Sequence, residues 1–532
     1  MKPLSRYLLG AMAGAMAFTM TPVLAETPAN MLVIANRIDD ITTLDPAESF
    51  EFAGSDLSRN VYGKLVNFDP MDLAAGYQPD LAESWTVSAD GKTITFKMRA
   101  GVKFHSGNPL TAADAVYSLQ RAVKLNKTPA FILTQFGFSA ENADQTIKQI
   151  DEMSFSITTD KKYATSFVLN CLTSTIGGIV DQKTVMANTV DGDMGSTWLK
   201  TNTAGSGAYK LLNWKPSESY TLTANNDFYA GKPHLERVVV RHISESSTQR
   251  LLLEKGDIDI ARNLNPQDVS GAVAAGGITV DSDLRGRLMY FSLNQKDPIL
   301  SKPKVVEAFK YLADYKGMQD SFLKGQYTVQ QAFLPKTYLG SIEDQPFSLN
   351  IAKAKALLAD AGVGDGFEVE LIVREAQERI EIAQSLQNTF AQAGIKSSIT
   401  VGTGKQTLSK YRARDFQIYV GAWGPDYPDP NTNAATFAVN VDNSDEAQAT
   451  GQLAWRNSWS IPDMSKATEA AVQEGDRDKR AKMYEDIQRE HQKASPFAVM
   501  FQKIEQTGRR SNVKNFNVGA AITAASYWNV TK

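Results

Sequence analysis

The sequence predicts an α/β protein with two lobes. Strand-like and helix-like stretches alternate along its 532 residues, and no fixed-period repeat stands out. After residue 301 the pattern changes, because longer helical stretches replace the strand-rich and turn-rich segments that come before. We therefore expect a second lobe to begin near residue 286.

The elements follow from local patterns. Residues 93–99 alternate with the two-residue period of a half-buried strand, and a helix is predicted to begin after Thr111, with Asp114 in its first turn. In the helix predicted at 375–393, Ile382, Leu386 and Phe390 recur every four residues and should face the core. Further strands are predicted at 220–223, 238–243, 368–373 and 416–423, and helices at 303–316, 350–361 and 375–393.

Composition narrows the class of protein. Hydrophobic residues make up 42% of the chain and charged residues 22%, which is typical of a globular protein. The 56 Lys and Arg nearly balance the 59 Asp and Glu, and the formal net charge is −3. No block of like charges offers a surface for nucleic acid or for an anionic membrane. We expect two or three domains and no nucleic-acid partner.

The first 25 residues are predicted to be a secretory signal peptide. Lys2 and Arg6 precede an uncharged stretch at 7–25, which closes with the small-residue pattern Val23-Leu24-Ala25. The alternative is a membrane anchor, because 19 uncharged residues approach a spanning length. Glycine, threonine and proline within the stretch favour cleavage, which would leave a mature chain beginning near Glu26 with a net charge of −5.

Cysteine usage agrees with export as a soluble protein. No cysteine follows the predicted cleavage point, so lipid attachment there would have no acceptor. The single cysteine, Cys171, lies in the apolar run 167–172 and is expected to be a buried small side chain. Without an intramolecular disulfide, the fold must be held together by its hydrophobic core.

Motifs for catalysis or metal binding are weak. The chain has four histidines, and His234 and His242 are eight residues apart without a nearby cysteine or a short carboxylate spacing, so a zinc site is poorly supported. Residues 402–405 resemble part of a phosphate loop, but Ile399 and Gln406 stand where glycine and serine or threonine are needed. We expect no metal, no cofactor and no catalysis.

The segment 421–431 is the strongest candidate for a binding site. A predicted strand ends there in an aromatic, acidic and proline-rich loop that contains Trp423, Asp426 and Tyr427. The aromatic rings could stack on an apolar group while the carboxylate pairs with a ligand cation. Alternatively, the acidic residues of this loop cap turns and Trp423 belongs to the core. The sequence pattern leaves both interpretations open.

Several stretches together resemble the large extracellular solute-binding proteins of bacterial dipeptide, oligopeptide and nickel import systems. The matching stretches are Thr43–Pro46, Leu81–Trp85, Phe96–Asp114, Gly205–Lys210, Asn225–Pro233 and Gly256–Asp259. Together they cover nearly all of the mature chain, and Phe96–Asp114 is the most specific match.

The resemblance implies a two-lobed, type II periplasmic binding protein that closes around its ligand. One lobe would comprise 26–60, 205–285 and 506–532, with an extra subdomain at 61–204, and the other lobe would comprise 286–505. Such a protein is a monomer that works in the periplasm. It hands its ligand to an inner-membrane ABC permease with cytoplasmic ATPase subunits. A peptide ligand is implied, with an oligosaccharide, an opine or another small solute as the alternative.

The resemblance also implies roles for particular residues. Asp426 would pair with the α-ammonium of a peptide, and Arg374 with its carboxylate. Ala422 and Gly424 would bind the peptide main chain through their backbone groups, and Trp423 would form a wall. The opposite lobe would contribute Phe50, Glu51 and Phe52, although these residues taken alone are more typical of packing under a loop. The sequence departs from the oligopeptide-binding pattern at Val420 and Pro425.

Overall fold

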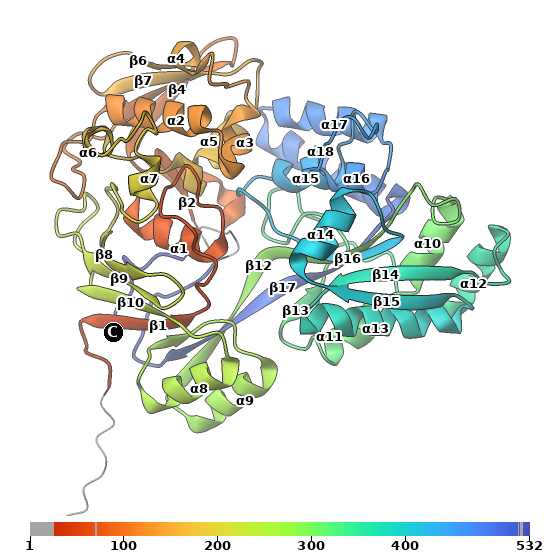
Figure 1. The fold of residues 1–532 in the computed structure, drawn as a ribbon. Helices are drawn as coiled ribbons and strands as arrows, with labels where there is room; N and C mark the ends of the chain where they lie inside the picture. Colours follow the sequence, from red (N-terminus) through yellow and green to blue (C-terminus); the bar gives the residue numbers. More distant parts are fainter. Residues whose placement is uncertain (1–25, 70–71, 520, 522–524) are drawn as a thin grey trace, which may run out of the picture.

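The computed structural model describes residues 26–69, 72–519, 521 and 525–532, and these form two lobes joined by a continuous sheet (Figure 1). The predicted signal peptide lies outside the described residues. The sheet has eleven strands in the order β15-β14-β16-β12-β17-β11-β1-β10-β9-β8, and β13 pairs with β17. Its strands are β1 (Met31–Asn36), β8 (Tyr209–Lys215), β9 (Ser219–Ala224), β10 (Arg237–His242), β11 (Ile260–Ala261), β12 (Ile278–Leu293), β13 (Tyr327–Val329), β14 (Glu368–Arg374), β15 (Lys396–Gly402), β16 (Ile418–Trp423) and β17 (Phe497–Arg510).

Two smaller sheets belong to the first half of the chain. One pairs β2 (Val66–Phe68) with β3 (Tyr77–Pro79). The other has the order β4-β5-β7-β6. Its strands are β4 (Ala82–Val87), β5 (Thr93–Met98), β6 (Ile147–Gln149) and β7 (Ser154–Thr158).

Helices cover the sheets of both lobes (Figure 1). In the first half they are α1 (Phe52–Val61), α2 (Ala112–Leu125), α3 (Phe131–Thr134), α4 (Ala143–Thr146), α5 (Thr165–Leu172), α6 (Gln182–Ala187), α7 (Ser196–Leu199), α8 (Ser246–Lys255) and α9 (Pro266–Ala275). In the second half they are α10 (Pro303–Tyr311), α11 (Tyr315–Asp320), α12 (Ile351–Asp360), α13 (Gln377–Gln392), α14 (Gly404–Arg412), α15 (Asn431–Phe437), α16 (Leu453–Arg456), α17 (Pro462–Gln473) and α18 (Arg477–Ala494). Short 3₁₀ turns are η1 (Leu73–Ala75), η2 (Thr128–Ala130) and η3 (Thr175–Gly177).

The long strands β12 and β17 connect the lobes. They pair with each other in antiparallel fashion, β12 continues to β16 on one side, and β17 continues to β11 on the other. The register between them breaks between Leu284 and Leu288. The predicted boundary near residue 286 therefore falls inside a strand, and the domain assignment as a whole stays a prediction.

The hydrophobic core is divided in the same way. One cluster gathers side chains from β1, α1, β9, β10 and the C-terminal segment, so the two ends of the described chain pack together. Near the C-terminus, the Lys532 ammonium lies 2.9 Å from the buried Asp259 carboxylate. A second cluster fills the region around β4, β5, β7, α2 and α5, and two further clusters pack both faces of the sheet formed by β12, β14, β16 and β17.

Most of the predicted elements are confirmed. Thr111 precedes α2, and its backbone N–H donates to the Asp114 carboxylate at 2.9 Å. The stripe of Ile382, Leu386 and Phe390 on α13 is fully buried, as is Cys171. Strand β14 pairs in parallel with both β15 and β16, which confirms the local β-α-β arrangement.

The predicted helix at 303–316 is wrong, because two helices occupy this stretch. Helix α10 ends at Tyr311, and α11 begins at Tyr315. The Asp314 carboxylate accepts a hydrogen bond from the Gly317 N–H at 2.9 Å, so Asp314 starts a new helix as its N-cap. The apolar pattern runs through both helices and hides this break.

The region around α3 and α5 touches the second lobe near α17 and α18 (Figure 1). The Ala164 N–H donates to the Val472 carbonyl at 2.7 Å, and the Asn170 amide donates to the Asp429 carboxylate at 3.3 Å. Lys161 and Glu469 form an exposed ion pair across the same contact. The lobes therefore meet on this side of the molecule.

Candidate functional site

A cavity of about 770 Å³ lies where β12 and β17 pass between the lobes. Both lobes contribute to its walls, as a cleft between lobes requires. The residues that line it are Asn36, Arg37, Asp39, Asp40, Phe52, Ala53, Asp56, Ser244, Gln249, Arg262, Asn263, Arg285, Gly286, Arg287, Arg374, Arg379, Ala422, Trp423, Gly424, Pro425, Lys503 and Glu505.

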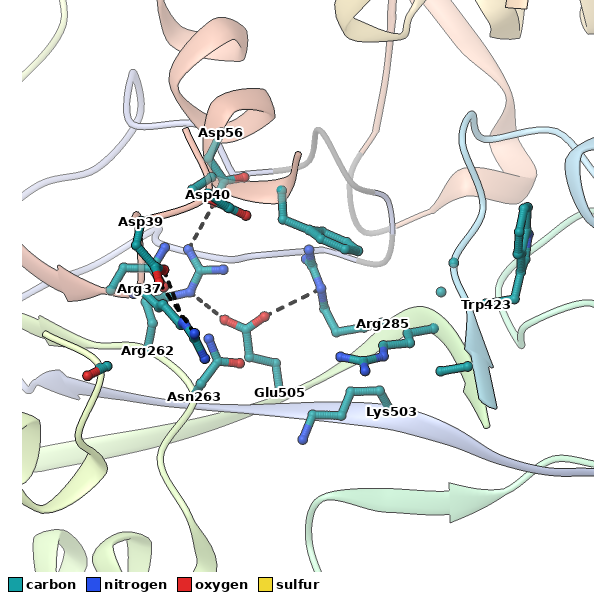
Figure 2. A pocket seen from close by; sticks show the side chains of 18 of the residues that line it. Arg37, Asp39, Asp40, Asp56, Arg262, Asn263, Arg285, Trp423, Lys503 and Glu505 are labelled. Carbon is teal, nitrogen blue, oxygen red and sulfur yellow. Dashed lines mark hydrogen bonds and ion pairs between the residues drawn. The ribbon is translucent and has the colours of Figure 1, made fainter. Parts of the chain in front are cut away.

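A chain of ion pairs runs along one side of the cavity (Figure 2). The Arg262 guanidinium contacts Asp56 at 3.2 Å and also pairs with Glu505, which lies 3.4 Å from Arg285. Although burial favours the neutral acid, the two arginines lower the pKa of Glu505 below its ordinary value. This network ties α1 to both connecting strands, so the charges of its members are already balanced.

Five of the predicted site residues line this cavity, namely Phe52, Arg374, Ala422, Trp423 and Gly424. Phe52 begins α1 in the first lobe, whereas Gly424 directly follows β16 in the second. A Cβ atom added to Gly424 would lie 3.6 Å from the tip of the Phe52 ring, so the two walls lie close together there. In Figure 2, Trp423 lies at the right of the view, across from Arg262 and Glu505.

Phe50 and Asp426 line a second, much smaller cavity of about 10 Å³. Ser49, Ser55 and Thr175 also line it. The two cavities adjoin along the chain, because residues 422–425 line the first and Asp426 lines the second. Burial raises the pKa of Asp426 to about 7. Among the described residues no cation forms an ion pair with this carboxylate, so its charge is uncompensated.

Glu51 and Tyr427 line neither cavity. Glu51 is the residue before α1, and its carboxylate accepts a hydrogen bond from the Phe50 N–H at 3.2 Å. Tyr427 is 5% exposed and packs in the core around α5, where its ring centre lies 6.0 Å from that of Phe167. The loop leaves the large cavity after Pro425, and Tyr427 then packs in the core.

Apart from Arg374, the sequence analysis singled out none of the charged residues that line the cavity, among them Asp40, Arg287, Arg379 and Lys503. Burial raises the pKa of Asp40 to about 6, and one of its carboxylate oxygens is buried without a hydrogen-bond partner. Arg287 and Lys503 lie in strands that carry several other charged residues, so no local pattern set them apart. The helical pattern around Arg379 gave no signal either.

Within the described residues, no group of three or more His, Cys, Asp and Glu is placed to hold a metal ion. Nor does any helix in that part of the chain combine the length and the apolar character needed to cross a membrane. The cavity lies between the two lobes, and charged side chains of both signs line it.

Comparison with known proteins decides the family. The profile of the bacterial extracellular solute-binding proteins, family 5 middle, matches residues 76–445. The chain belongs to this family. The predicted resemblance and the two-lobed α/β fold are therefore confirmed.

Similar proteins cover nearly the whole chain. The "Probable D,D-dipeptide-binding periplasmic protein DdpA" of Escherichia coli K12 is 26% identical, with 92% of each chain covered. The solved structure of HbpA2 from Haemophilus parasuis is 25% identical and has a TM-score of 0.79, covering 94% of this chain and 99% of that one. The Helicobacter pylori periplasmic binding protein DppA, solved with the peptide STSA, is 22% identical and has a TM-score of 0.77, covering 94% of this chain and 98% of that one.

These comparisons define the general role of this family 5 protein. Family members bind solutes and are not enzymes, and the similar proteins are periplasmic binding components of ABC importers. The protein is therefore a solute-binding component of an ABC importer.

Proposed function

We propose that this protein is a soluble, monomeric periplasmic receptor that binds short peptides between its lobes and catalyses no reaction. It delivers them to an inner-membrane permease with cytoplasmic ATPase subunits. Removal of residues 1–25, without lipid attachment, releases it into the periplasm. The observation that carries the proposal is the cavity of about 770 Å³, whose walls bring acidic and basic side chains together from both lobes. Cavities of roughly 300 to 1,000 Å³ are typical of sites for small ligands.

The large cavity and the small cavity beside it together offer a partner for each part of a short peptide. Asp426 is the proposed partner of the α-ammonium, because it is the unpaired carboxylate at the end of the 422–426 segment. The backbone groups of Ala422 and Gly424 follow the end of β16 and can bond the peptide main chain. Arg374 at the end of β14 is the proposed partner of the carboxylate. Trp423 and Phe52 supply apolar surface on opposite walls.

Phe50, Glu51 and Tyr427 support the site from outside the large cavity. Phe50 borders Asp426 in the small cavity, and Glu51 holds the turn before α1. Tyr427 anchors the loop after Asp426 in the neighbouring core. Their contribution to ligand binding is proposed to act through the position of these two segments.

The absence of catalysis is part of the proposal. None of the four histidines lines the large cavity, and Cys171 is fully buried in the core. A hydrolase would need a nucleophile with an adjacent base, or a metal site, facing the ligand. Incubation of the purified protein with mixed peptides should therefore leave them intact. Recovery of cleaved peptides, after controls that exclude a contaminating protease, would overturn the proposal that the protein catalyses no reaction.

Melting curves across ligand classes test the proposal. Short peptides, oligosaccharides, opines and nickel chelates would each be added to the full mature chain. A ligand that binds the native state alone stabilises it by about 2.7 kcal/mol at a hundredfold excess over its Kd. Peptides should raise the melting midpoint. If only sugars or opines raise it, the alternative ligand class replaces peptides.

A further inference from the structure

We infer that the bound solute carries at least two anionic groups, which in a peptide are the C-terminal carboxylate and a side-chain carboxylate. This inference rests on the proposed function and names the class of peptide that the cavity prefers. Its basis is a cationic cluster at the cavity, defined as Arg287 and Lys503 on the connecting strands together with Arg374 and Arg379 of the second lobe.

The charges that line the cavity do not balance. Seven arginines and lysines face four acidic residues. Three of the acids are already paired. Asp39 binds Arg37 at 3.0 Å, while Asp56 and Glu505 hold Arg262 and Arg285. Among the described residues, no carboxylate lies within ion-pair distance of any member of the cationic cluster, so four cations remain for the ligand.

Arg287 repels two other members of the cluster, Lys503 and Arg379. Burial and then the charge of Arg287 lower the pKa of Lys503 to about 8. Burial and then Arg287 also lower the pKa of Arg379. Glu378 acts on both groups in the opposite direction but forms no ion pair with either in the described structure. An anion among these side chains would relieve the repulsion.

Arg379 gives the second, independent observation. Its side chain is 6% exposed, and its Nε is buried without a hydrogen-bond partner. A buried donor without a partner is costly, particularly on a charged group. The Lys503 ammonium is also weakly hydrogen-bonded, since its distance to the Gln326 side-chain oxygen is 3.4 Å. One carboxylate could bind one guanidinium through two hydrogen bonds and would leave most of the cluster unpaired. A second carboxylate is therefore needed.

Calorimetry with two matched dipeptides tests the inference. Ala-Glu and Ala-Gln have nearly the same size and differ by one charge. The full mature chain should bind Ala-Glu about tenfold more tightly than Ala-Gln, since a charge-assisted bond to the cluster is stronger than an amide contact. Glutarate, which has two carboxylates and no amine, serves as a third probe.

Variants connect the preference to the cluster. Arg287→Gln should reduce the Ala-Glu preference below threefold, and Lys503→Gln should do the same if Arg287→Gln fails to fold. Arg489→Gln is the control, because Arg489 lies on α18 outside the cavity and its substitution removes an equal charge. If the preference survives in both cluster variants, or falls equally in the control, the inference is overturned.

The outcomes separate the two proposals. If Ala-Gln binds within threefold of Ala-Glu, the inference fails and peptide binding stands. If glutarate binds and both dipeptides do not, two anionic groups are still required but the peptide proposal fails. If none of the three probes binds, both are overturned.

Discussion

At the scale of single residues, burial determines the chemistry of the two acidic side chains that could hold a ligand amine. It raises the pKa of Asp426 to about 7 and that of Asp40 to about 6. Neither carboxylate forms an ion pair in the described structure. A ligand ammonium beside either group would favour its ionised form and gain a strong, charge-assisted hydrogen bond.

Asp426→Asn keeps the shape of this side chain and removes its charge. If Asp426 anchors the ligand amine, the affinity for the identified ligand should fall by about 2 to 5 kcal/mol, as it does when one member of a buried charged pair is lost. Calorimetry measures this loss, and Asp442→Asn on an exposed loop is the control. Binding within twofold of the parent, together with a lower melting midpoint, would show that Asp426 caps the loop instead.

The raised pKa of Asp426 also predicts a pH dependence. Its ligand-free folded pKa of about 7 lies above the ordinary value of 3.8, so the folded chain holds a proton that the unfolded chain releases. The resulting stability is present at low pH and is lost as the pH rises through about 7. The melting midpoint of Asp426→Asn should therefore rise relative to that of the parent as the pH increases from about 4 to about 7. Parallel curves for the two proteins would refute the assignment.

At the scale of elements, a buried ion pair positions the loop that carries Asp426. Arg480 on α18 binds both oxygens of Asp429, at 2.9 and 2.7 Å, and both side chains are almost fully buried. Asp429 also accepts hydrogen bonds from the Asn431 N–H and from the Asn170 amide of the opposite lobe. One carboxylate thus connects the loop, α18 and α5.

Arg480→Met should destabilise the protein by about 3 to 5 kcal/mol, because it leaves the Asp429 carboxylate buried without its partner. Ligand affinity should fall as well, since the loop loses its anchor. Denaturant unfolding and calorimetry measure the two effects. Arg489→Met on the same helix is the control, because that exposed arginine pairs with Asp344 and should contribute at most about 1 kcal/mol. Equal effects of the two substitutions would contradict this role.

Gly205 fixes the packing of α1, which carries Phe52 and Asp56 into the cavity. A Cβ atom at this position would lie 2.0 Å from the backbone oxygen of Val61 at the end of α1. Gly205→Ala should cost about 1 to 3 kcal/mol of stability through overpacking. Gly475→Ala is the matched control, because no atom lies within 4 Å of its added Cβ. Unchanged denaturation of Gly205→Ala would show that the backbone there adjusts freely.

The sequence predicted the elements well where a pattern was complete within a short segment. The strand alternation of β5 and the buried stripe of α13 are of this kind. The break at Asp314 was missed because the apolar spacing continues across it. The pairing of β12 with β17 was also missed, since these strands are some 200 residues apart and no local pattern specifies their register.

The candidate site was predicted in part. Residues 422–424 lie at the end of a strand that the local pattern predicts, whereas the roles of Phe52 and Arg374 came from the family resemblance, and all of these residues line the large cavity. The cationic cluster was not predictable, because it forms only when β12, β14, α13 and β17 come together. The sequence suggested that the ring of Tyr427 could stack on an apolar group of the ligand, and the structure places this ring in the core around α5.

At the scale of the whole molecule, the sheet and the lobe contacts suit a receptor that encloses its ligand. Strands β12 and β17 run through both lobes, and the cavity lies beside their register break. Contacts such as that of Ala164 with Val472 hold the lobes together on one side. Opening of the lobes for ligand exchange would have to break these contacts while the connecting strands persist.

The central claim is that one solute is held between the two lobes, and a crystal structure of the mature chain with its most stabilising ligand tests it most directly. The account predicts ligand density in the cavity of about 770 Å³, in contact with the cationic cluster and with the backbone at residues 422–424. Two other pockets are large enough to be alternative positions for the ligand. They are the cavity of about 680 Å³ lined by Arg59, Lys64 and Trp528, and the groove of about 640 Å³ along α17 and α18. Ligand density in either of them, with the interlobe cavity empty, would contradict the claim.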